Sequence, residues 1–185
     1  MPDGSTGFNN NTWRSLNSPA TVLPWDVRPV DLDELVLAEA GRLRAAGATV
    51  TVAGPDAVRI DGSRSELTRL LRNLGDNAVA HARSTVTLGL TVQDQQAVLS
   101  VADDGPGVPA ADRERIFQRF TRLDAARTRT ADGGGAGLGL AICRQIVQRH
   151  HGQITVGGGV GDGGRFVVRL PMVTGHSAPS AGAAS

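Results

Sequence analysis

Apolar residues recur at helical spacing in three stretches of the chain, and each stretch predicts a helix with one buried face. The middle stretch, residues 63–81, is the most regular, because apolar residues return every three or four positions. Ser63, with Glu66 three residues later, has the pattern of a capping box and starts this helix. The other helices are predicted between Asp31 and Gly47 and from Gly137 to about His150. The predicted buried positions of the middle helix are Leu67, Leu70, Leu71, Leu74 and Ala78.

Alternating apolar and polar residues predict strands between these helices. Residues 86–92 alternate strictly, the residues QDQQ are predicted to turn, and residues 97–102 return, so this region is predicted to be a hairpin. Helices and strands that alternate in a chain of 185 residues predict a single α/β domain. Further strands are predicted at residues 48–53, 57–60, 153–156 and 165–170, and a short helix carrying Ile116, Phe117 and Phe120 is predicted after Asp112.

The two ends of the chain lack this periodicity. Residues 1–28 are rich in Asn, Ser, Pro and Thr and are predicted to be a flexible arm or linker. Residues 172–185 consist largely of small residues and are predicted to be a disordered tail. The domain is therefore predicted to occupy residues 29–171, and the stretch 121–136 inside it has the composition of a long functional loop.

Composition excludes several classes of function. The net charge is +1, so the chain has no basic excess for nucleic acid. All 19 basic residues are Arg, which excludes a P-loop, a Ser/Thr/Tyr kinase fold and a Schiff-base lysine. Cys143 is the only cysteine, which is typical of a reducing compartment. The chain has neither a signal peptide nor an apolar run of about 18 residues, so we expect a cytoplasmic protein that does not insert into a membrane.

Two asparagines lie along the edge of the buried face of the middle helix. Asn73 and Asn77 are four residues apart and share a narrow stripe with Glu66. They are either polar residues at a solvated margin or side chains that meet a ligand at the border of the core. If the ligand is a triphosphate, Asn77 is the first candidate for its magnesium ion and Asn73 the second, because an amide carbonyl is a neutral oxygen ligand.

A glycine-rich stretch, DDGPG, follows the hairpin at residues 103–107. Glycine allows the backbone to pass close to a flat ligand, and a carboxylate at the end of a strand accepts hydrogen bonds from an amino group such as adenine N6. Guanine presents a carbonyl there, so Asp103 would select adenine. The alternative is an ordinary Asp-Gly turn.

A second glycine-rich stretch, GGGAGLGL at residues 133–140, leads into the last helix. Gly135, Gly137 and Gly139 would expose backbone N–H groups to phosphate, although a flexible hinge has the same composition. The GxGxxG match at residues 159–164 joins two predicted strands instead of a strand and a helix, so a hairpin turn is predicted there.

Arginines on the preceding loop are candidates for closing over the phosphates. Arg119 and Arg122 are the main ones, with Arg127 and Arg129 as further candidates. The alternative is a solvated surface, which is the usual place for arginines in a loop.

Taken in order, these stretches resemble the catalytic ATP-binding domain of bacterial sensor histidine kinases. LTRLLRNLGDNAVAHA resembles the asparagine box, DDGPGVP the first glycine box, RIFQRFTR the phenylalanine box and GGGAGLGLAI the second glycine box. The ending, IVQRHHGQI followed by GDGGRFVVRLP, also resembles the family's last helix and strand pair. The resemblance implies a two-layer sandwich in which a mixed, mostly antiparallel sheet packs on three helices, with a lid at about residues 109–136.

The resemblance also implies the cofactors ATP and Mg²⁺ and a set of site residues. Asn77 would hold magnesium, Asn73 would support the phosphates, and Asp103 would bind adenine. Arg119 and Arg122 would act from the lid. The implied catalytic residues are Asn77, Arg119 and Arg122. The implied ATP-binding residues are Asn73, Asn77, His81, Asp103, Gly105, Gly107, Val108, Phe117, Arg119, Gly135, Ala136, Gly137, Leu138, Gly139 and Leu140.

The chain departs from the family pattern at several positions. Ala80 stands where a Lys or Arg is frequent, Gly164 where Thr is usual, and His151 where Gly is common. None of the four histidines has the sequence context of the family's phosphoacceptor. We therefore expect the acceptor His on a dimerisation-domain partner or on a missing part of a longer receptor, with a response regulator receiving the phosphoryl group afterwards.

Two other functions are compatible with the sequence. The chain would be a non-catalytic ATP-sensing module if Ala80 removes a necessary phosphate contact, or a Ser kinase of the anti-sigma-factor type. The phenylalanine box argues against the second alternative.

Overall fold

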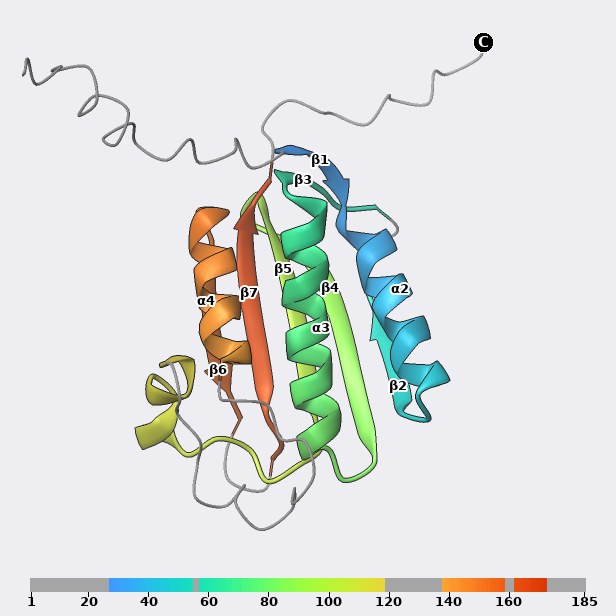
Figure 1. Cartoon of the computed structure of the whole chain (residues 1–185), viewed down its shortest axis with the longest axis vertical. Helices are drawn as coiled ribbons and strands as arrows, with labels where there is room; N and C mark the ends of the chain where they lie inside the picture. Colours follow the sequence, from blue (N-terminus) through green and yellow to red (C-terminus); the bar gives the residue numbers. More distant parts are fainter. Residues whose placement is uncertain (1–26, 55–56, 119–137, 159–161, 173–185) are drawn as a thin grey trace, which may run out of the picture.

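The computed structural model describes residues 27–54, 57–118, 138–158 and 162–172. In these ranges five strands form one sheet in the order β2-β4-β5-β7-β6, and three helices cover one face of it (Figure 1). The helices are α2 (Leu32–Ala45), α3 (Arg64–His81) and α4 (Gly139–Arg149). The strands are β2 (Thr49–Ala53), β4 (Thr85–Gln93), β5 (Gln96–Asp103), β6 (Gln153–Gly157) and β7 (Arg165–Pro171). The predicted mixed sheet packed on helices is confirmed.

Smaller elements complete the described fold. β1 (Arg28–Asp31) pairs with β3 (Arg59–Gly62) in a separate antiparallel ribbon at one end of the sheet. Two 3-10 turns, η1 (Ala110–Asp112) and η2 (Arg115–Phe117), follow β5. The short helix predicted after Asp112 is therefore a pair of single turns in the described residues, and Phe120 lies outside them.

The sheet is antiparallel except for one pair. β2 and β4 run parallel, because the connection between them includes α3, which brings the chain back to the end of the sheet where β2 began. The pairs β4–β5, β5–β7 and β6–β7 are antiparallel. The β4–β5 turn needs only Asp94 and Gln95, both with positive φ angles of 49° and 58°. Two such residues match the right-handed twist of a hairpin, so the turn is shorter than the predicted QDQQ.

The core lies between the sheet and the helices. All five predicted buried positions of α3 are at most 2% exposed, and they pack with Val86, Leu88 and Leu90 of β4. On the opposite face of the sheet the β2–β4 pair carries threonines, and the hydroxyls of Thr51 and Thr87 are 2.9 Å apart on these neighbouring strands. This alternation explains why the helices cover a single face.

The predicted element boundaries shift by one or two residues. The strand predicted at 57–60 runs from Arg59 to Gly62. Asp31 precedes α2 but makes no capping bond, because its carboxylate pairs with Arg59 at 2.6 Å. The capping box of α3 is half formed: Ser63 Oγ accepts a 3.5 Å bond from Glu66 N, but the Glu66 carboxylate does not return to Ser63 N.

A buried acidic side chain belongs to an ion-pair cluster that joins α2 to α3 through Arg42. Glu39 is 5% exposed and forms a bidentate pair with Arg42, whose guanidinium also reaches Asp76 of α3 at 2.5 Å. These two carboxylates raise the pKa of Arg42. A Cβ at Gly75, in the middle of α3, would lie 2.6 Å from Glu39 Oε1, so glycine leaves the space that this buried pair needs.

Gly75→Ala is expected to destabilise the protein, although replacing glycine by alanine within a helix normally stabilises by about 1 kcal/mol. The added methyl group would displace the Glu39 carboxylate from Arg42. Gly41→Ala is the matched control, because Gly41 is also helical and a Cβ there meets no atom within 4 Å. Urea unfolding would measure both variants. Equal stabilisation by the two substitutions would show that Glu39 adapts at no cost.

Candidate functional site

Polar contacts along α3 and α4 show that the two helices run antiparallel. Glu66 pairs with Arg149, Leu70 O lies 3.8 Å from Cys143 Sγ, and Asn73 Nδ2 donates a 3.4 Å bond to Gly139 O. As residue numbers rise along α3, the residue numbers of the contacts on α4 fall. The first turn of α4, with its free N–H groups and the positive end of its dipole, therefore begins beside Asn73.

Asn77 lies further along α3 than the residue that contacts the start of α4. It lies one turn, or about 6 Å, further along α3 than Asn73. Its side chain is half-buried and makes no hydrogen bond to another described residue. An amide carbonyl in front of a helix N-terminus is available to a ligand, and the assignment of magnesium to Asn77 stays a prediction.

The cysteine beside Asn73 is chemically inert. Cys143 is fully buried, and burial raises the pKa of its thiol to about 12. A neutral thiol is neither a nucleophile nor a metal ligand. We therefore assign it to the packing between α3 and α4.

Asp103 occupies the predicted place at the end of β5. It is 8% exposed, and its Oδ1 accepts bonds from Gly105 N at 2.9 Å and Gly164 N at 3.3 Å. Oδ2 accepts no hydrogen bond from the described residues. It is also not one of the described side-chain atoms that are both fully buried and without a hydrogen-bond partner. The carboxylate is therefore held by one oxygen and presents the other as a free acceptor.

The first glycine-rich stretch packs against the carboxyl-terminal end of α3. A Cβ at Gly105 would overlap the carbonyl oxygen of His81, so only glycine allows this approach. Asn77 lies one turn before His81 on the same helix. α3 therefore contacts the DDGPG stretch at its end and the start of α4 at Asn73, and Asn77 lies between these two contacts.

Asp104 is a structural residue that the sequence analysis did not identify. Its carboxylate accepts bonds from the backbone N–H groups of Arg83, Ser84 and Thr85 and a short bond from the Ser84 hydroxyl. These donors, above all Ser84, hold the pKa of Asp104 well below its usual range. Asp104 thus fixes the connection from α3 to β4. The sequence signal that could have pointed to it is the second Asp of the pair that precedes Gly105.

The remaining predicted residues are placed in different surroundings. Phe117 is buried and meets Phe166 edge-on with ring centroids 6.2 Å apart. His81 is exposed, and so is Ala80 beside it. Gly107, Val108, Leu138 and Leu140 are half-buried. Arg119, Arg122, Gly135, Ala136 and Gly137 lie outside the described residues, as do Arg127 and Arg129.

A cavity of about 350 Å³ lies on the other side of α4 from Asn73. It is lined by residues of η2, α4 and β6, including Phe117, Arg144 and Val156. It therefore belongs to a different region from the asparagine stripe. β6 and β7 pair antiparallel, so the GxGxxG match joins two hairpin strands, as predicted.

The described part of the chain contains no helix that is both long and apolar enough to cross a membrane.

Comparison with known proteins identifies the family. Residues 62–174 match the family described as histidine kinase-, DNA gyrase B-, and HSP90-like ATPase. The chain is 38% identical over 154 residues to the probable sensor histidine kinase TcrY of Mycobacterium tuberculosis, a match that covers 80% of this chain and 32% of TcrY. The chain thus spans about a third of the length of such curated relatives.

Solved structures with the same fold come from the same kind of protein. The mycobacterial sensor histidine kinase MprB aligns with a TM-score of 0.66 and 28% identity, over 79% of this chain and 97% of the MprB chain. Full-length ShkA in complex with AMPPNP aligns with a TM-score of 0.70 and 30% identity, over 82% of this chain and 32% of the ShkA chain. The family match covers more than half of the chain, and the chain therefore belongs to the histidine kinase-, DNA gyrase B- and HSP90-like ATPases, as an ATP-binding domain of the sensor histidine kinase type.

Proposed function

We propose that this chain binds ATP with Mg²⁺ at the exposed edge of α3, between the DDGPG stretch and the start of α4. The observation that carries the proposal is that Gly105 of the first glycine-rich stretch and Gly139 of the second both contact α3, on either side of Asn77. The similar ShkA structure contains AMPPNP, which supports an adenine nucleotide as the ligand.

The residues present fit such a ligand. Asp103 Oδ2 is a free acceptor for the adenine amino group, and its partner oxygen is fixed by two backbone N–H groups. The first turn of α4 presents N–H groups and a positive dipole end to phosphate. Asn77 offers a neutral oxygen where a phosphate-bound magnesium ion, which supplies charge neutralisation, would lie.

The similar proteins TcrY and BaeS are named as histidine kinases, whose reaction is phosphoryl transfer, and we propose that this chain supplies the nucleotide-binding half of such a reaction. Catalysis of this type depends on positioning and charge neutralisation, so the acceptor and its base can belong to another domain. Of the chain's histidines, His150 is 4% exposed, and His81 is followed by Ala, Arg and Ser. We therefore place the acceptor His on a dimerisation domain, separate or joined, and a response regulator after it.

Asn77→Ala is expected to remove most of the contribution of magnesium to ATP binding. Calorimetric titration of the wild type should show tighter ATP binding with Mg²⁺ than without it. The variant should lose about tenfold in affinity with the ion and little without it, because one oxygen ligand is removed. Asn73→Ala is the control. It loses the bond to Gly139, and it should weaken ATP binding by the same factor with and without Mg²⁺.

The same preparations test the transfer step. With radiolabelled ATP and a dimerisation-domain protein of this family, the wild type should label a His of the partner and Asn77→Ala should label it far more slowly. Bound ATP without any labelled partner would remove the kinase role and leave a nucleotide-sensing module. Equal magnesium dependence in wild type and Asn77→Ala would remove the assignment of the ion.

A further inference from the structure

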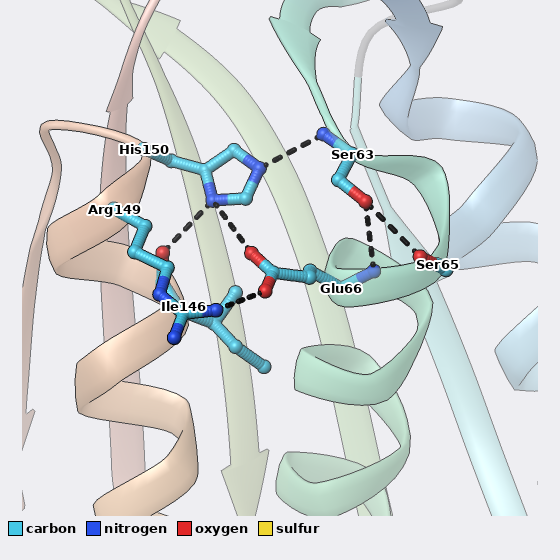
Figure 2. Close-up of polar contacts among 6 residues, drawn as sticks. All are labelled: Ser63, Ser65, Glu66, Ile146, Arg149 and His150. Atoms are coloured by element: carbon cyan, nitrogen blue, oxygen red, sulfur yellow. Dashed lines mark hydrogen bonds and ion pairs between the residues drawn. The ribbon is translucent and has the colours of Figure 1, made fainter. Parts of the chain in front are cut away.

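A buried histidine connects the far ends of the two helices that frame the proposed site. His150 follows the last residue of α4 and is 4% exposed. Figure 2 shows its ring between the two helices, with Nε2 directed at Ser63 N and Nδ1 at Ile146 O. The two distances are 3.1 Å and 2.8 Å.

These two partners fix the protonation of the ring. Ser63 N–H is a donor, so Nε2 must accept with its lone pair. Ile146 O is an acceptor, so Nδ1 must carry the proton. The imidazole is therefore neutral and in a single tautomer. Its two nitrogens bind different helices, because Nδ1 donates within α4 and Nε2 accepts from the start of α3.

The contact to Ser63 replaces part of an ordinary helix cap. In a complete capping box the Glu66 carboxylate would accept the Ser63 N–H. Here Glu66 turns toward α4 instead, where Oε1 lies 2.5 Å from Arg149 and Oε2 lies 4.0 Å from His150 Nδ1 (Figure 2). The Ser63 N–H at the start of α3 thus binds a side chain from the end of α4, while Ser63 Oγ still accepts the bond from Glu66 N.

The His150–Ser63 hydrogen bond is buried and, at 3.1 Å, shorter than the other buried polar contact between the two helices in the described residues. The other buried contact is a thiol 3.8 Å from Leu70 O, and thiols are weak donors. The Asn73–Gly139 bond is long at 3.4 Å, and Arg149 is largely exposed. The buried contacts that hold α4 in place along α3 are therefore apolar packing and this hydrogen bond, with the Glu66–Arg149 pair on the more exposed side.

We infer that His150 is a positioning residue for the nucleotide site, acting through α4. A helix of 11 residues is a rod of about 16 Å, so a shift at its carboxyl-terminal end moves its first turn by a similar amount. That first turn meets Asn73, and its N–H groups are the proposed phosphate cradle. The inference rests on the proposed function, and it adds a residue at the opposite end of α4 from the ligand.

Two substitutions separate the two bonds of the ring. In His150→Gln the side-chain oxygen reaches the position of Nε2 and can still accept the Ser63 N–H, while the bond to Ile146 is lost. In His150→Asn the side-chain nitrogen occupies the position of Nδ1 and can still donate to Ile146 O, while the bond to α3 is lost. Both variants remove the ring, so their stabilities are the internal control.

The experiment compares ATP affinity by calorimetry, stability by urea unfolding and amide exchange of residues 139–142. We expect His150→Asn to bind ATP about tenfold more weakly than His150→Gln and to exchange faster at the start of α4. His150→Gln should retain nearly wild-type affinity. Equal affinities in the two variants, or affinities that follow stability alone, would overturn the inference.

The readouts also distinguish this inference from the proposed function. If the wild type does not bind ATP, the proposed function fails. Faster exchange at residues 139–142 in His150→Asn than in His150→Gln would still show that the ring positions α4. Equal exchange in the two variants would show that it does not.

Discussion

Asp103→Asn is expected to weaken ATP binding by about 10- to 100-fold while the domain stays folded. Asparagine Oδ1 can keep both bonds from Gly105 N and Gly164 N, because they reach a single oxygen of Asp103. The free Oδ2 becomes an NH₂ group, which faces the adenine amino group as a second donor. Loss of a hydrogen bond to a charged group costs about 1.5–3 kcal/mol, which gives this range of affinity.

GTP provides the sharper measurement of the same variant. The new amide donor suits the carbonyl of guanine, so the preference for ATP over GTP should shrink along with the loss of ATP affinity. Calorimetric titration with both nucleotides checks this. An unchanged preference would show that the base is read elsewhere.

Asp104→Asn is the matched control for this experiment. It alters the neighbouring carboxylate, whose partners are the backbone groups after α3 and not the proposed base. Because those bonds depress the pKa of Asp104, its charged form contributes stability at neutral pH that is lost as the pH falls through its low folded-state pKa. The control should therefore lower stability and leave the ATP preference intact.

Local patterns predicted the elements of this fold because each pattern reports on its own segment. The apolar period of residues 63–81 corresponds to the buried face of α3, and the alternation of residues 86–92 corresponds to β4. Boundaries moved where a distant residue took over a local role. Asp31 did not cap α2, because Arg59 of the neighbouring strand binds its carboxylate.

The second half of the capping box did not form for the same physical reason. Ser63 and Glu66 satisfy the local pattern, but His150 lies 87 residues away in sequence and accepts the Ser63 N–H instead. No periodicity or motif in residues 63–66 contains that information. Only the antiparallel packing of α4 on α3 brings the imidazole there.

The structure brings some of the predicted site residues together, and their roles stay predictions. Asn73 and Gly139 were singled out separately from a helix edge and a glycine-rich stretch, and the structure places them in contact. Asp103 is where its motif predicted, and the oxygen that stays free is decided jointly by Gly105 N inside the motif and by Gly164 N, 61 residues later. The motif names the residue and supplies one of its two backbone donors, whereas the second donor comes from a chain segment that the motif does not include.

Gly163→Ala is expected to have the largest effect on stability, at about 3 kcal/mol. Gly163 has a φ angle of +80°, and an alanine there carries a backbone strain of about 1 kcal/mol. A Cβ would also overlap the carbonyl oxygen of Asp103, with the Asp103 carbonyl carbon at 2.9 Å and Asp104 Cα at 3.2 Å. Such backbone atoms cannot rotate away, so overpacking adds about 1–3 kcal/mol.

Gly47→Ala separates the two contributions. Gly47 has a similar φ angle of +91°, but a Cβ there meets no atom within 4 Å, so only the cost of about 1 kcal/mol remains. The clash at residue 163 would push on the backbone of Asp103, and it should therefore reduce ATP affinity in protein that is still folded, as Gly47→Ala should not. Urea unfolding and calorimetry on the two variants check both effects. Equal losses of stability would mean that the β6–β7 connection moves freely away from Asp103, and the free carboxylate oxygen would then not be held for a ligand.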